Sequence, residues 1–364
     1  MKIAVDGYEL GKEARGVGRV IHNLLLELFS LRLEDEFVIY TKEDIGAYNR
    51  PRAHEVVLAA RRGYLRWQNG PLRQALQKLR ADIFIASNYI LPLFPPARSI
   101  LFEHDISVVS HPSWYPRRYA LTRRYLTRRS LRLAAAVVVS SEFVKMEILS
   151  RFNLPPGKIR VISYGVEEKF RPAQAEDIRL WRKKKNLEEK KVVGYLGSIF
   201  KRRHIPLLVR AVELLRRENP AVVLYLVGKD FGALDDPAVA RLLNESWVRW
   251  EQTLPEEELP LFYSGLDVFA YLSEYEGFGF PPLEALACGV PVVVLDRSSL
   301  REIFCGLGIM VDQPDEKEVA AALRTALMDE ATKVRMRLEF EKARSRLSWK
   351  RAAAELSELF ESLD

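Results

Sequence analysis

The 364 residues are too many for one hydrophobic core of ordinary size and suit two domains. Hydrophobic residues make up 48% and charged residues 29%, a balance that argues against a disordered chain, and no stretch approaches the roughly 20 apolar residues that span a bilayer. Residues 1–165 carry 26 Lys and Arg against 15 Asp and Glu, whereas the remainder is slightly acidic, so the excess positive charge belongs to the first half.

In the first half, short β-branched runs alternate with amphipathic stretches, which predicts parallel strands covered by helices. The predicted strands are residues 2–6, 36–40, 56–58, 82–86, 100–104 and 136–140. The first apolar run stops at Asp6, so we expect no signal peptide. The two cysteines, Cys288 and Cys305, are too few for a disulfide framework or a metal cluster, and a reducing cytoplasm is the expected location.

Two short motifs lie at places where a doubly wound sheet binds ligands. Gly16 and Gly18 precede the first predicted helix, residues 20–28, and Ile21 stands where a dinucleotide-binding fingerprint has its third glycine, which argues against a nicotinamide or flavin enzyme. His104 lies at the carboxyl end of a predicted strand, within the sequence EHD. The five histidines show no metal-ligand spacing, so we expect no metal.

The segment from residue 115 to residue 132 alternates arginines with tyrosines and leucines. Such a segment can lie on an anionic lipid surface with its aromatic rings in the interface. It can equally form a solvated helix face whose apolar side packs on its own domain, and the sequence leaves both interpretations open. We expect no nucleic-acid partner, because no recognised nucleic-acid motif accompanies the charge.

After an expected linker at residues 163–191, the alternation of strands and helices begins again. The strands are predicted at residues 191–197, 222–227, 267–272 and 292–295, and the helices at 206–218, 259–264 and 282–287. Ligands of doubly wound sheets bind beyond the carboxyl ends of the strands. With two such sheets, the cleft between the domains is the expected site.

The most informative segment is residues 264–294, SGLDVFAYLSEYEGFGFPPLEALACGVPVVV. A glycine-rich loop from Glu276 to Phe280 follows a strand, and two prolines then open a helix whose first turn is expected to hold Glu284. Gly289 is expected to end that helix in the left-handed conformation. The start of a helix favours a diphosphate, glycines allow close approach of the backbone, and carboxylates suit sugar hydroxyls.

A basic turn follows the first strand of the second half, residues 197–204, GSIFKRRH. Cations at the carboxyl end of a strand would stabilise a leaving diphosphate as its charge develops. The candidate residues in this turn are Ser198, Lys201, Arg202 and Arg203.

The string EGFGFPPLEALACGVPVV, with two glutamates in an E-x7-E spacing, resembles the signature of family 4 of the retaining glycosyltransferases, which have the GT-B fold. The glycines at residues 16–18, the His104-Asp105 pair, the basic turn and the helix after Trp349 resemble further segments of that family. The resemblance implies an α/β fold of two facing, doubly wound Rossmann-like domains with parallel sheets and an interdomain cleft. An acceptor-side domain would cover residues 1–170, with residues 346–364 crossing back onto it, and a nucleotide-sugar domain would cover 171–345.

The resemblance also implies a role for each candidate residue. Arg202 and Arg203 would hold the diphosphate; Arg203 replaces the lysine usual in the family, and Lys201 could take its place. Glu276 would bind the transferred sugar and stabilise positive charge at its anomeric carbon, and Glu284 would bind the ribose. The donor would also be held by Ser198 and by the backbone amides of Gly277, Phe278, Gly279 and Phe280, with Gly16, Gly18 and His104 near the phosphates, sugar and acceptor.

The implied activity is metal-independent transfer of a hexose, with retention, from a nucleotide diphosphate sugar to a glycan or lipid-linked acceptor. The same string resembles bacterial polysaccharide mannosyltransferases, which favours GDP-mannose over a UDP-glucose-type donor. The alternatives are a nucleotide-sugar hydrolase or epimerase on the same scaffold, and a non-catalytic protein that binds nucleotide-sugars or a membrane surface. If the basic segment binds lipid, the protein would lie peripherally on the inner face of the cell membrane.

Overall fold

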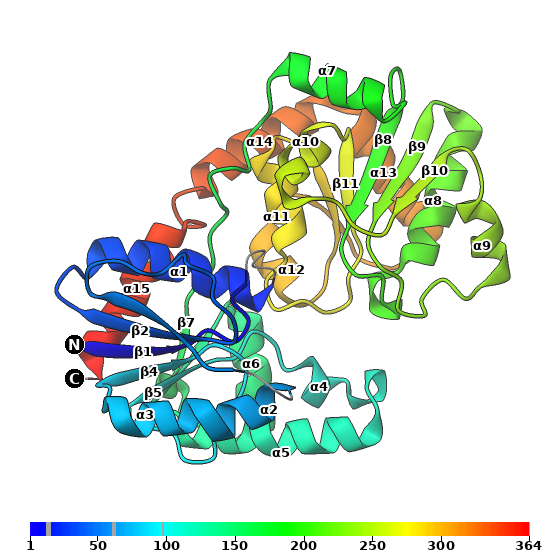
Figure 1. The fold of residues 1–364 in the computed structure, drawn as a ribbon. Coiled ribbons are helices and arrows are strands. Elements are labelled where there is room, and N and C mark those ends of the chain that lie inside the picture. The colour runs from blue at the N-terminus through cyan, green and yellow to red at the C-terminus, as the bar shows by residue number, and fades with distance from the viewer. Residues whose placement is uncertain (12–15, 60–62, 97, 364) are drawn as a thin grey trace. The chain divides into compact units, whose positions relative to one another are not determined.

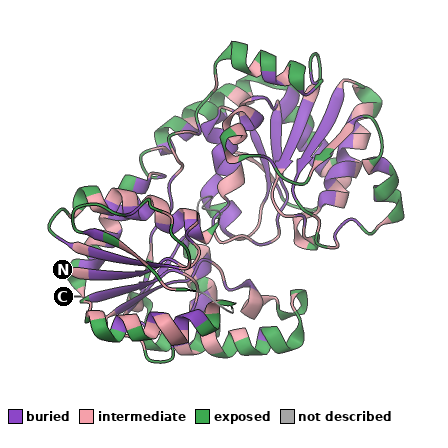
Figure 2. Ribbon diagram, in the orientation of Figure 1, coloured by how far each residue is buried: buried purple, intermediate pink, exposed green. Residues whose placement is uncertain are grey.

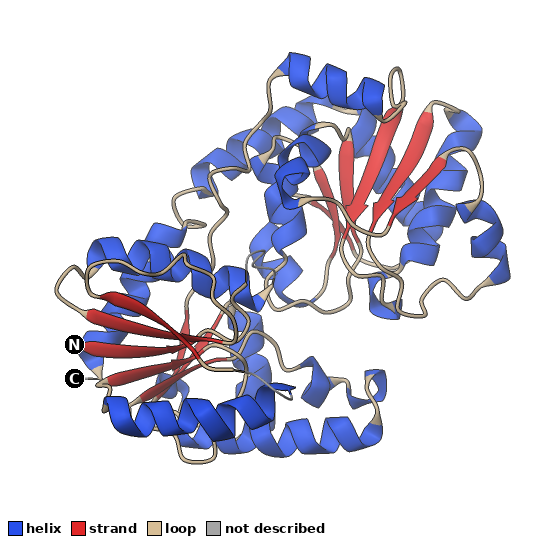
Figure 3. Cartoon of the chain, in the orientation of Figure 1, coloured by secondary structure: helices blue, strands red, loops and turns tan. Residues whose placement is uncertain are grey.

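The computed structural model describes residues 1–11, 16–59, 63–96 and 98–363. The chain divides into two compact units, one formed by Met1–Gly165 with Arg346–Asp364 and the other by Val166–Ser345. We call them unit 1 and unit 2. Each is built on its own parallel β-sheet with helices packed against it (Figure 3).

Unit 1 holds a seven-stranded sheet in the order β3-β2-β1-β4-β5-β6-β7, with every neighbouring pair parallel. Its strands are β1 Lys2–Asp6, β2 Glu36–Thr41, β3 Ala53–Val57, β4 Ile83–Ala86, β5 Ser99–Phe102, β6 Ala136–Val139 and β7 Ile159–Val161. The strand order reverses direction at β1, which pairs with β2 on one side and β4 on the other. A loop-lined ligand site is expected beyond the carboxyl ends of strands at such a reversal.

Helices cover both faces of this sheet, with α1 and α15 on one face and α3 and α5 on the other (Figure 1). The helices are α1 Val17–Leu31, α2 Gly63–Trp67, α3 Arg73–Leu79, α4 Ser107–Ser110, α5 Arg117–Leu133, α6 Glu142–Arg151 and α15 Trp349–Ser362, with shorter turns η1 Gln68–Leu72, η2 Pro112–Trp114 and η3 Pro156–Lys158. The C-terminal helix α15 is fastened to this unit: Arg32 donates to the Ser357 hydroxyl at 2.8 Å, and Trp349 stacks on Tyr164.

Unit 2 holds a six-stranded parallel sheet in the order β10-β9-β8-β11-β12-β13. Its strands are β8 Lys191–Leu196, β9 Val222–Val227, β10 Val248–Glu251, β11 Val268–Tyr271, β12 Val292–Leu295 and β13 Ile309–Val311. Its helices are α7 Ala175–Lys184, α8 Ile205–Glu218, α9 Pro237–Leu243, α10 Leu259–Ser264, α11 Phe280–Ala287, α12 Ser298–Phe304, α13 Glu316–Met328 and α14 Glu330–Ala343, with turns η4 Lys201–Arg203 and η5 Glu256–Glu258. The central strands are buried on both faces, as expected for a parallel sheet between helix layers (Figure 2).

Most predicted strands are found within one or two residues, but the sequence patterns do not predict β7, β10 or β13, and β3 lies at residues 53–57 instead of 56–58. All four are edge strands of their sheets. Each has partly exposed residues, because an edge strand is covered less completely than a central one. Polar or charged residues interrupt β3, β7 and β10, and β13 is only three residues long, so none forms a long apolar run.

The expected linker at residues 163–191 is wrong over much of its length. Residues 175–184 form α7, which packs within unit 2. Trp181 is 5% exposed and stacks on Tyr225 with ring centroids 6.0 Å apart. Because charged residues surround this single buried aromatic, the hydrophobic pattern of the segment does not predict a helix.

Candidate functional site

An arginine and a glutamate from two different loops meet in unit 2. Arg203 ends the turn after β8, and Glu276 lies in the loop after β11; β8 and β11 are neighbouring strands. The Nε of Arg203 donates to Oε1 of Glu276 at 3.0 Å, and Nη2 lies at the same distance from that oxygen. Because the strands are parallel, both loops leave the same edge of the sheet, and this edge brings the two charges together.

Both partners of this pair are largely removed from water, with side-chain exposures of 12% for Arg203 and 15% for Glu276. Burial is the largest single influence on the pKa of Arg203 and alone would lower it. The Glu276 carboxylate together with Tyr271 and Tyr195 outweighs burial, and the pKa rises well above its usual value. Oε1 of Glu276 also accepts from Tyr271 at 3.0 Å and Ser273 at 2.8 Å. Oε2 receives no hydrogen bond from the described residues, so one carboxylate oxygen is held firmly and the other remains available.

Two stacked tyrosines support the arginine. Tyr195 on β8 and Tyr271 on β11 stack with centroids 5.9 Å apart, and the Arg203 guanidinium lies 5.3 Å from the centroid of the Tyr271 ring. Arg203 also donates to the Ser198 carbonyl at 2.9 Å, and Tyr195 donates to the same oxygen at 3.0 Å. The sequence motifs do not identify Tyr195, Tyr271 or Ser273 as site residues; their position at the carboxyl ends of predicted strands is the signal that indicates them.

The other residues of the basic turn are placed differently. The Arg202 guanidinium lies 4.5 Å from the centroid of the Phe200 ring. The backbone carbonyl of Arg202 accepts a hydrogen bond from the Glu274 amide at 2.8 Å. Lys201 is exposed at the start of the turn. His204 pairs with Glu274 at 2.7 Å. The turn is therefore tied to the residues after β11 at two points besides the Arg203–Glu276 pair.

The glycine-rich loop from Glu276 to Phe280 is anchored on α12. The Glu276 amide donates to the Ser298 hydroxyl at 3.1 Å, and the Ser299 hydroxyl donates to the Glu276 carbonyl at 2.8 Å. Gly279 has φ +103°, and a Cβ there would lie 2.7 Å from Leu300. Only glycine fits both the conformation and the packing at this position.

Helix α11 begins at Phe280, two residues before the predicted start, with Gly279 as its N-cap. Gly289 follows the helix in the left-handed region, as predicted. The placement of Glu284 in the first turn is wrong: with the helix beginning at residue 280, Glu284 lies in the second turn. It is 2% exposed and accepts from the Tyr263 hydroxyl of α10 at 2.7 Å. Glu276 is thus bound to the basic turn and Glu284 to α10.

The remaining candidates lie in unit 1. Gly16 caps α1 with φ +54°, and a Cβ on Gly18 would lie 2.2 Å from the Glu9 carbonyl oxygen, so Gly18 is required for close packing. His104 is buried, with Nδ1 at 2.8 Å from the Tyr164 hydroxyl and Nε2 at 2.9 Å from the Ser87 carbonyl. Burial lowers the pKa of His104, so the ring is neutral; Nε2 donates to the carbonyl and Nδ1 accepts from the tyrosine. Both nitrogens are engaged within unit 1.

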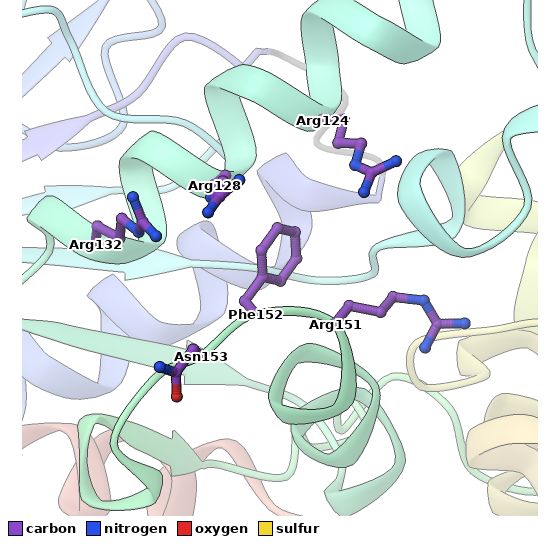
Figure 4. A pocket seen from close by; sticks show the side chains of 6 residues that line it. All are labelled: Arg124, Arg128, Arg132, Arg151, Phe152 and Asn153. Atoms are coloured by element: carbon purple, nitrogen blue, oxygen red, sulfur yellow. The ribbon is translucent and has the colours of Figure 1, made fainter.

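The basic segment at 115–132 forms most of α5, and its exposed face carries both charge and apolar side chains. Leu121 is 70% and Tyr125 66% exposed. Beside them, four arginines surround Phe152 and Asn153 in a pocket of about 100 Å³ between α5 and the end of α6 (Figure 4). The arginines are Arg124, Arg128, Arg132 and Arg151. Arg151 pairs with Glu147, whereas the three on α5 make no ion pair with the described residues.

The described residues hold neither a metal-binding cluster nor a membrane-spanning helix. His, Cys, Asp and Glu side chains nowhere gather in threes in a way that would hold a metal ion. None of the described helices combines the length and the apolar character needed to cross a membrane.

Known proteins resemble the chain in both units. Residues 14–170 match the family described as Glycosyltransferase Family 4, and residues 177–345 match Glycosyl transferases group 1. O-antigen chain mannosyltransferase B of Escherichia coli is 30% identical over 266 residues, which are 72% of this chain and 70% of the relative. A D-inositol 3-phosphate glycosyltransferase of Corynebacterium urealyticum is 29% identical over 66% of this chain and 60% of its own length.

The fold has counterparts among solved structures. The crystal structure of HepE from Anabaena, in complex with UDP and glucose, matches with a TM-score of 0.77 at 17% identity, with 100% of both chains covered. That likeness concerns the fold, which is the two-sheet α/β arrangement known as GT-B. Together with the matches in both halves of the sequence, it confirms the resemblance seen in the E-x7-E string: the chain belongs to glycosyltransferase family 4 and has the GT-B fold.

Proposed function

We propose that this glycosyltransferase moves a hexose, with retention and without a metal ion, from a nucleotide diphosphate sugar to a hydroxyl of a glycan or lipid-linked acceptor. Mannose from GDP-mannose is our choice of donor, with a UDP-glucose-type donor as the alternative. The choice is supported by the relative named an O-antigen chain mannosyltransferase and by the resemblance of the string EGFGFPPLEALACGVPVV to such enzymes. That name also supports a role in polysaccharide or glycolipid synthesis.

The observation that carries the proposal is the Arg203–Glu276 pair. A carboxylate with one oxygen held by four donor atoms and one oxygen available can bind a sugar hydroxyl without reorganising. The same carboxylate would stabilise positive charge that develops at the anomeric carbon. Arg203, held against it, would meet the leaving diphosphate, so the pair places opposite charges at the two ends of the bond that breaks.

The other donor contacts follow from position in unit 2. Arg202, Lys201 and Ser198 lie in the basic turn and would surround the phosphates with Arg203. The backbone amides from Gly277 to Phe280 lie at the start of α11, where the helix dipole favours an anion. Glu284 would share its buried carboxylate between Tyr263 and the ribose hydroxyls.

In the proposed reaction, the acceptor hydroxyl attacks from the face that the diphosphate leaves, and a leaving phosphate oxygen takes the hydroxyl's proton. The acceptor would bind to the domain of residues 1–170 with 346–364, near Gly16, Gly18 and His104, and the donor to residues 171–345. His104 would act as a positioning residue, because both ring nitrogens are already bonded. Exclusion of water from the bound donor would limit hydrolysis.

The test is a comparison of GDP-mannose, UDP-glucose and related donors with and without a panel of glycan acceptors. Transfer that requires acceptor supports the proposal. Full-rate consumption of donor without acceptor would identify a hydrolase or epimerase, and binding without any turnover would identify a non-catalytic binding protein.

Glu276→Gln, Glu284→Gln and Arg202→Ala should each suppress transfer while leaving the circular dichroism spectrum unchanged; wild-type rates in all three would contradict the assigned site.

We also propose that α5 contacts an anionic membrane surface, which would place the protein peripherally on the cytoplasmic face. Exposed Leu121 and Tyr125 would enter the interface, and the arginines of the pocket in Figure 4 would bind lipid phosphates. Each arginine near such a surface contributes about 1 kcal/mol. The double substitution Arg124→Gln with Arg128→Gln should therefore weaken binding to phosphatidylglycerol vesicles about 30-fold. Equal binding to phosphatidylcholine vesicles would contradict the proposal.

A further inference from the structure

A second pocket lies in unit 1, at the carboxyl ends of its strands, and none of the roles assigned above uses it. Its volume is about 630 Å³, within the range of about 300–1,000 Å³ typical of small-molecule sites. Its walls come from the loops after β4 and β5 and from α2, α4 and α5. Four tyrosines line it: Tyr64, Tyr89, Tyr115 and Tyr119.

A buried glutamate, Glu103, lines this pocket. Glu103 follows β5 and is 1% exposed, yet its Oε2 has no hydrogen-bond partner within the described residues. Burial raises the pKa of Glu103 well above its usual range, Asp105 adds to the increase, and Arg123 opposes it. An unsatisfied buried carboxyl costs stability, so a group that persists there calls for a ligand that completes its hydrogen bonds.

Arg123 and Asp105 provide matching groups in the same pocket. The Arg123 guanidinium lies 5.3 Å from the centroid of the Tyr89 ring, and its buried Nε also has no partner within the described residues. Oδ1 of Asp105 accepts hydrogen bonds from the amide and the hydroxyl of Ser107. Oδ2 of Asp105 accepts no hydrogen bond from the described residues. The hydroxyl of Ser107 in turn lies 2.7 Å from that of Tyr115.

The chemistry of these groups selects a neutral, hydroxyl-rich ligand. A hydroxyl both donates and accepts, so it can bridge a carboxyl oxygen and a guanidinium, whereas a phosphate would meet the two acidic groups. Tyrosine rings offer flat apolar surfaces for the faces of a pyranose and hydroxyls for its edges. We propose that this pocket binds the pyranose unit of the acceptor that carries the attacking hydroxyl, with Glu103 and Arg123 determining which sugar is accepted.

The inference rests on the proposed function in one respect, that the bound sugar is the acceptor. The experiment distinguishes failure of the inference from failure of the proposed function. Saturation-transfer NMR would measure binding of methyl α-D-mannoside, methyl α-D-glucoside and the methyl glycoside of N-acetylglucosamine. Binding of GDP-mannose and UDP-glucose would be measured separately. The variants are Glu103→Leu, Glu103→Gln and, as a control, Glu142→Leu, which changes an exposed glutamate of the same unit.

We expect wild type to prefer one glycoside and Glu103→Leu to weaken its binding at least about tenfold, since a buried hydrogen bond is lost. Glu103→Gln should stay within a few-fold of wild type, because an amide donates and accepts like a protonated carboxyl. The melting temperature of Glu103→Leu should not fall, whereas loss of a merely structural glutamate would lower it. Glycoside binding without nucleotide-sugar binding would contradict the proposed function, but the pocket would still be identified as a sugar-binding site.

Three results would overturn the inference. The first is unchanged glycoside binding by Glu103→Leu, and the second is equal loss in Glu142→Leu. The third is a wild-type protein that binds none of the three glycosides at millimolar concentration.

Discussion

Arg203 and Glu276 are bonded to each other at 3.0 Å although they lie 73 positions apart in the chain. The contact exists because β8 and β11 are neighbours in a parallel sheet and release their loops at the same edge. In the proposed reaction Arg203 contacts the diphosphate of the donor and Glu276 contacts its sugar. Their mutual bond means that neither can move without the other, so the donor would meet a site whose charges are already oriented.

Removing the arginine should damage both stability and transfer. Arg203→Met leaves Glu276 as a largely buried carboxylate without its cation, and breaking such a pair costs about 3–5 kcal/mol when burial is complete. We expect a loss of about 2–4 kcal/mol, because the pair keeps a little contact with water, and a decrease of about 10²–10³-fold in kcat. The matched control is Arg179→Met, which breaks an exposed Arg–Glu pair of unit 2 and should change stability by less than about 1 kcal/mol. Urea unfolding and initial-rate kinetics measure both quantities.

The two stacked tyrosines allow a finer test of how Glu276 is held. Tyr271→Phe keeps the stack and removes one donor to Oε1, and it should cost about 1 kcal/mol in stability and lower kcat several-fold. Tyr195→Phe removes a hydroxyl that bonds to the Ser198 carbonyl instead, so it should leave kcat closer to wild type. Equal kinetic effects of the two substitutions would show that the Tyr271 hydroxyl has no particular role at the carboxylate.

The glycine-rich loop can be tested with two glycines that share a left-handed backbone. Gly306→Ala, at φ +78° with open space around the new methyl group, should cost about 1 kcal/mol from backbone strain. Gly279→Ala, at φ +103°, adds a methyl group 2.7 Å from Leu300 and should cost about 1–3 kcal/mol more. It should also raise the KM for the donor, because the loop that carries Glu276 would shift away from α12. Calorimetry and donor titration of both variants give the comparison.

The sequence predicted the elements that carry this site better than the contacts within it. The strand before Glu276 and the helix with its glycine cap at Gly289 follow from turn residues and apolar runs, which act locally. The pairing of Arg203 with Glu276 depends on which strands are neighbours, and hydrophobic periodicity carries no information about strand order. The exact start of α11 decided the turn in which Glu284 lies, and helix boundaries are the least certain feature of a sequence pattern.

The sequence does not predict the pocket in unit 1, for a different reason. In the sequence Glu103 is only the residue before His104, whereas the lack of a hydrogen bond to its Oε2 from the described residues is a property of the folded environment. Similarly, α7 contains one large buried aromatic, Trp181, and its remaining residues are mostly charged, so its helical packing depends on Tyr225 from a distant strand. Local propensity cannot supply such long-range partners.

A pH prediction follows from a second buried carboxyl near that pocket. Asp6, at the end of β1, is fully buried and accepts from the Tyr64 hydroxyl at 2.6 Å. Burial raises the pKa of Asp6 from 3.8 to about 6, while the Tyr64 and Tyr8 hydrogen bonds oppose the increase. The native state therefore binds this proton more tightly than the unfolded chain does. Its contribution to stability is complete below pH 3.8 and is lost as the pH rises through about 6.

At 1.36 kcal/mol for each pH unit, the loss attributable to Asp6 amounts to about 3 kcal/mol. Asp6→Asn keeps the size of the side chain and cannot titrate. The free energy of unfolding of wild type minus that of the variant should therefore decrease by about this amount between pH 3 and pH 7 and stay level above pH 7. Other ionisable groups titrate in both proteins and cancel in the difference. A difference that is flat across this range, or that increases with pH, would mean that Asp6 is ionised in the native protein and that its burial is compensated by the tyrosine hydroxyl.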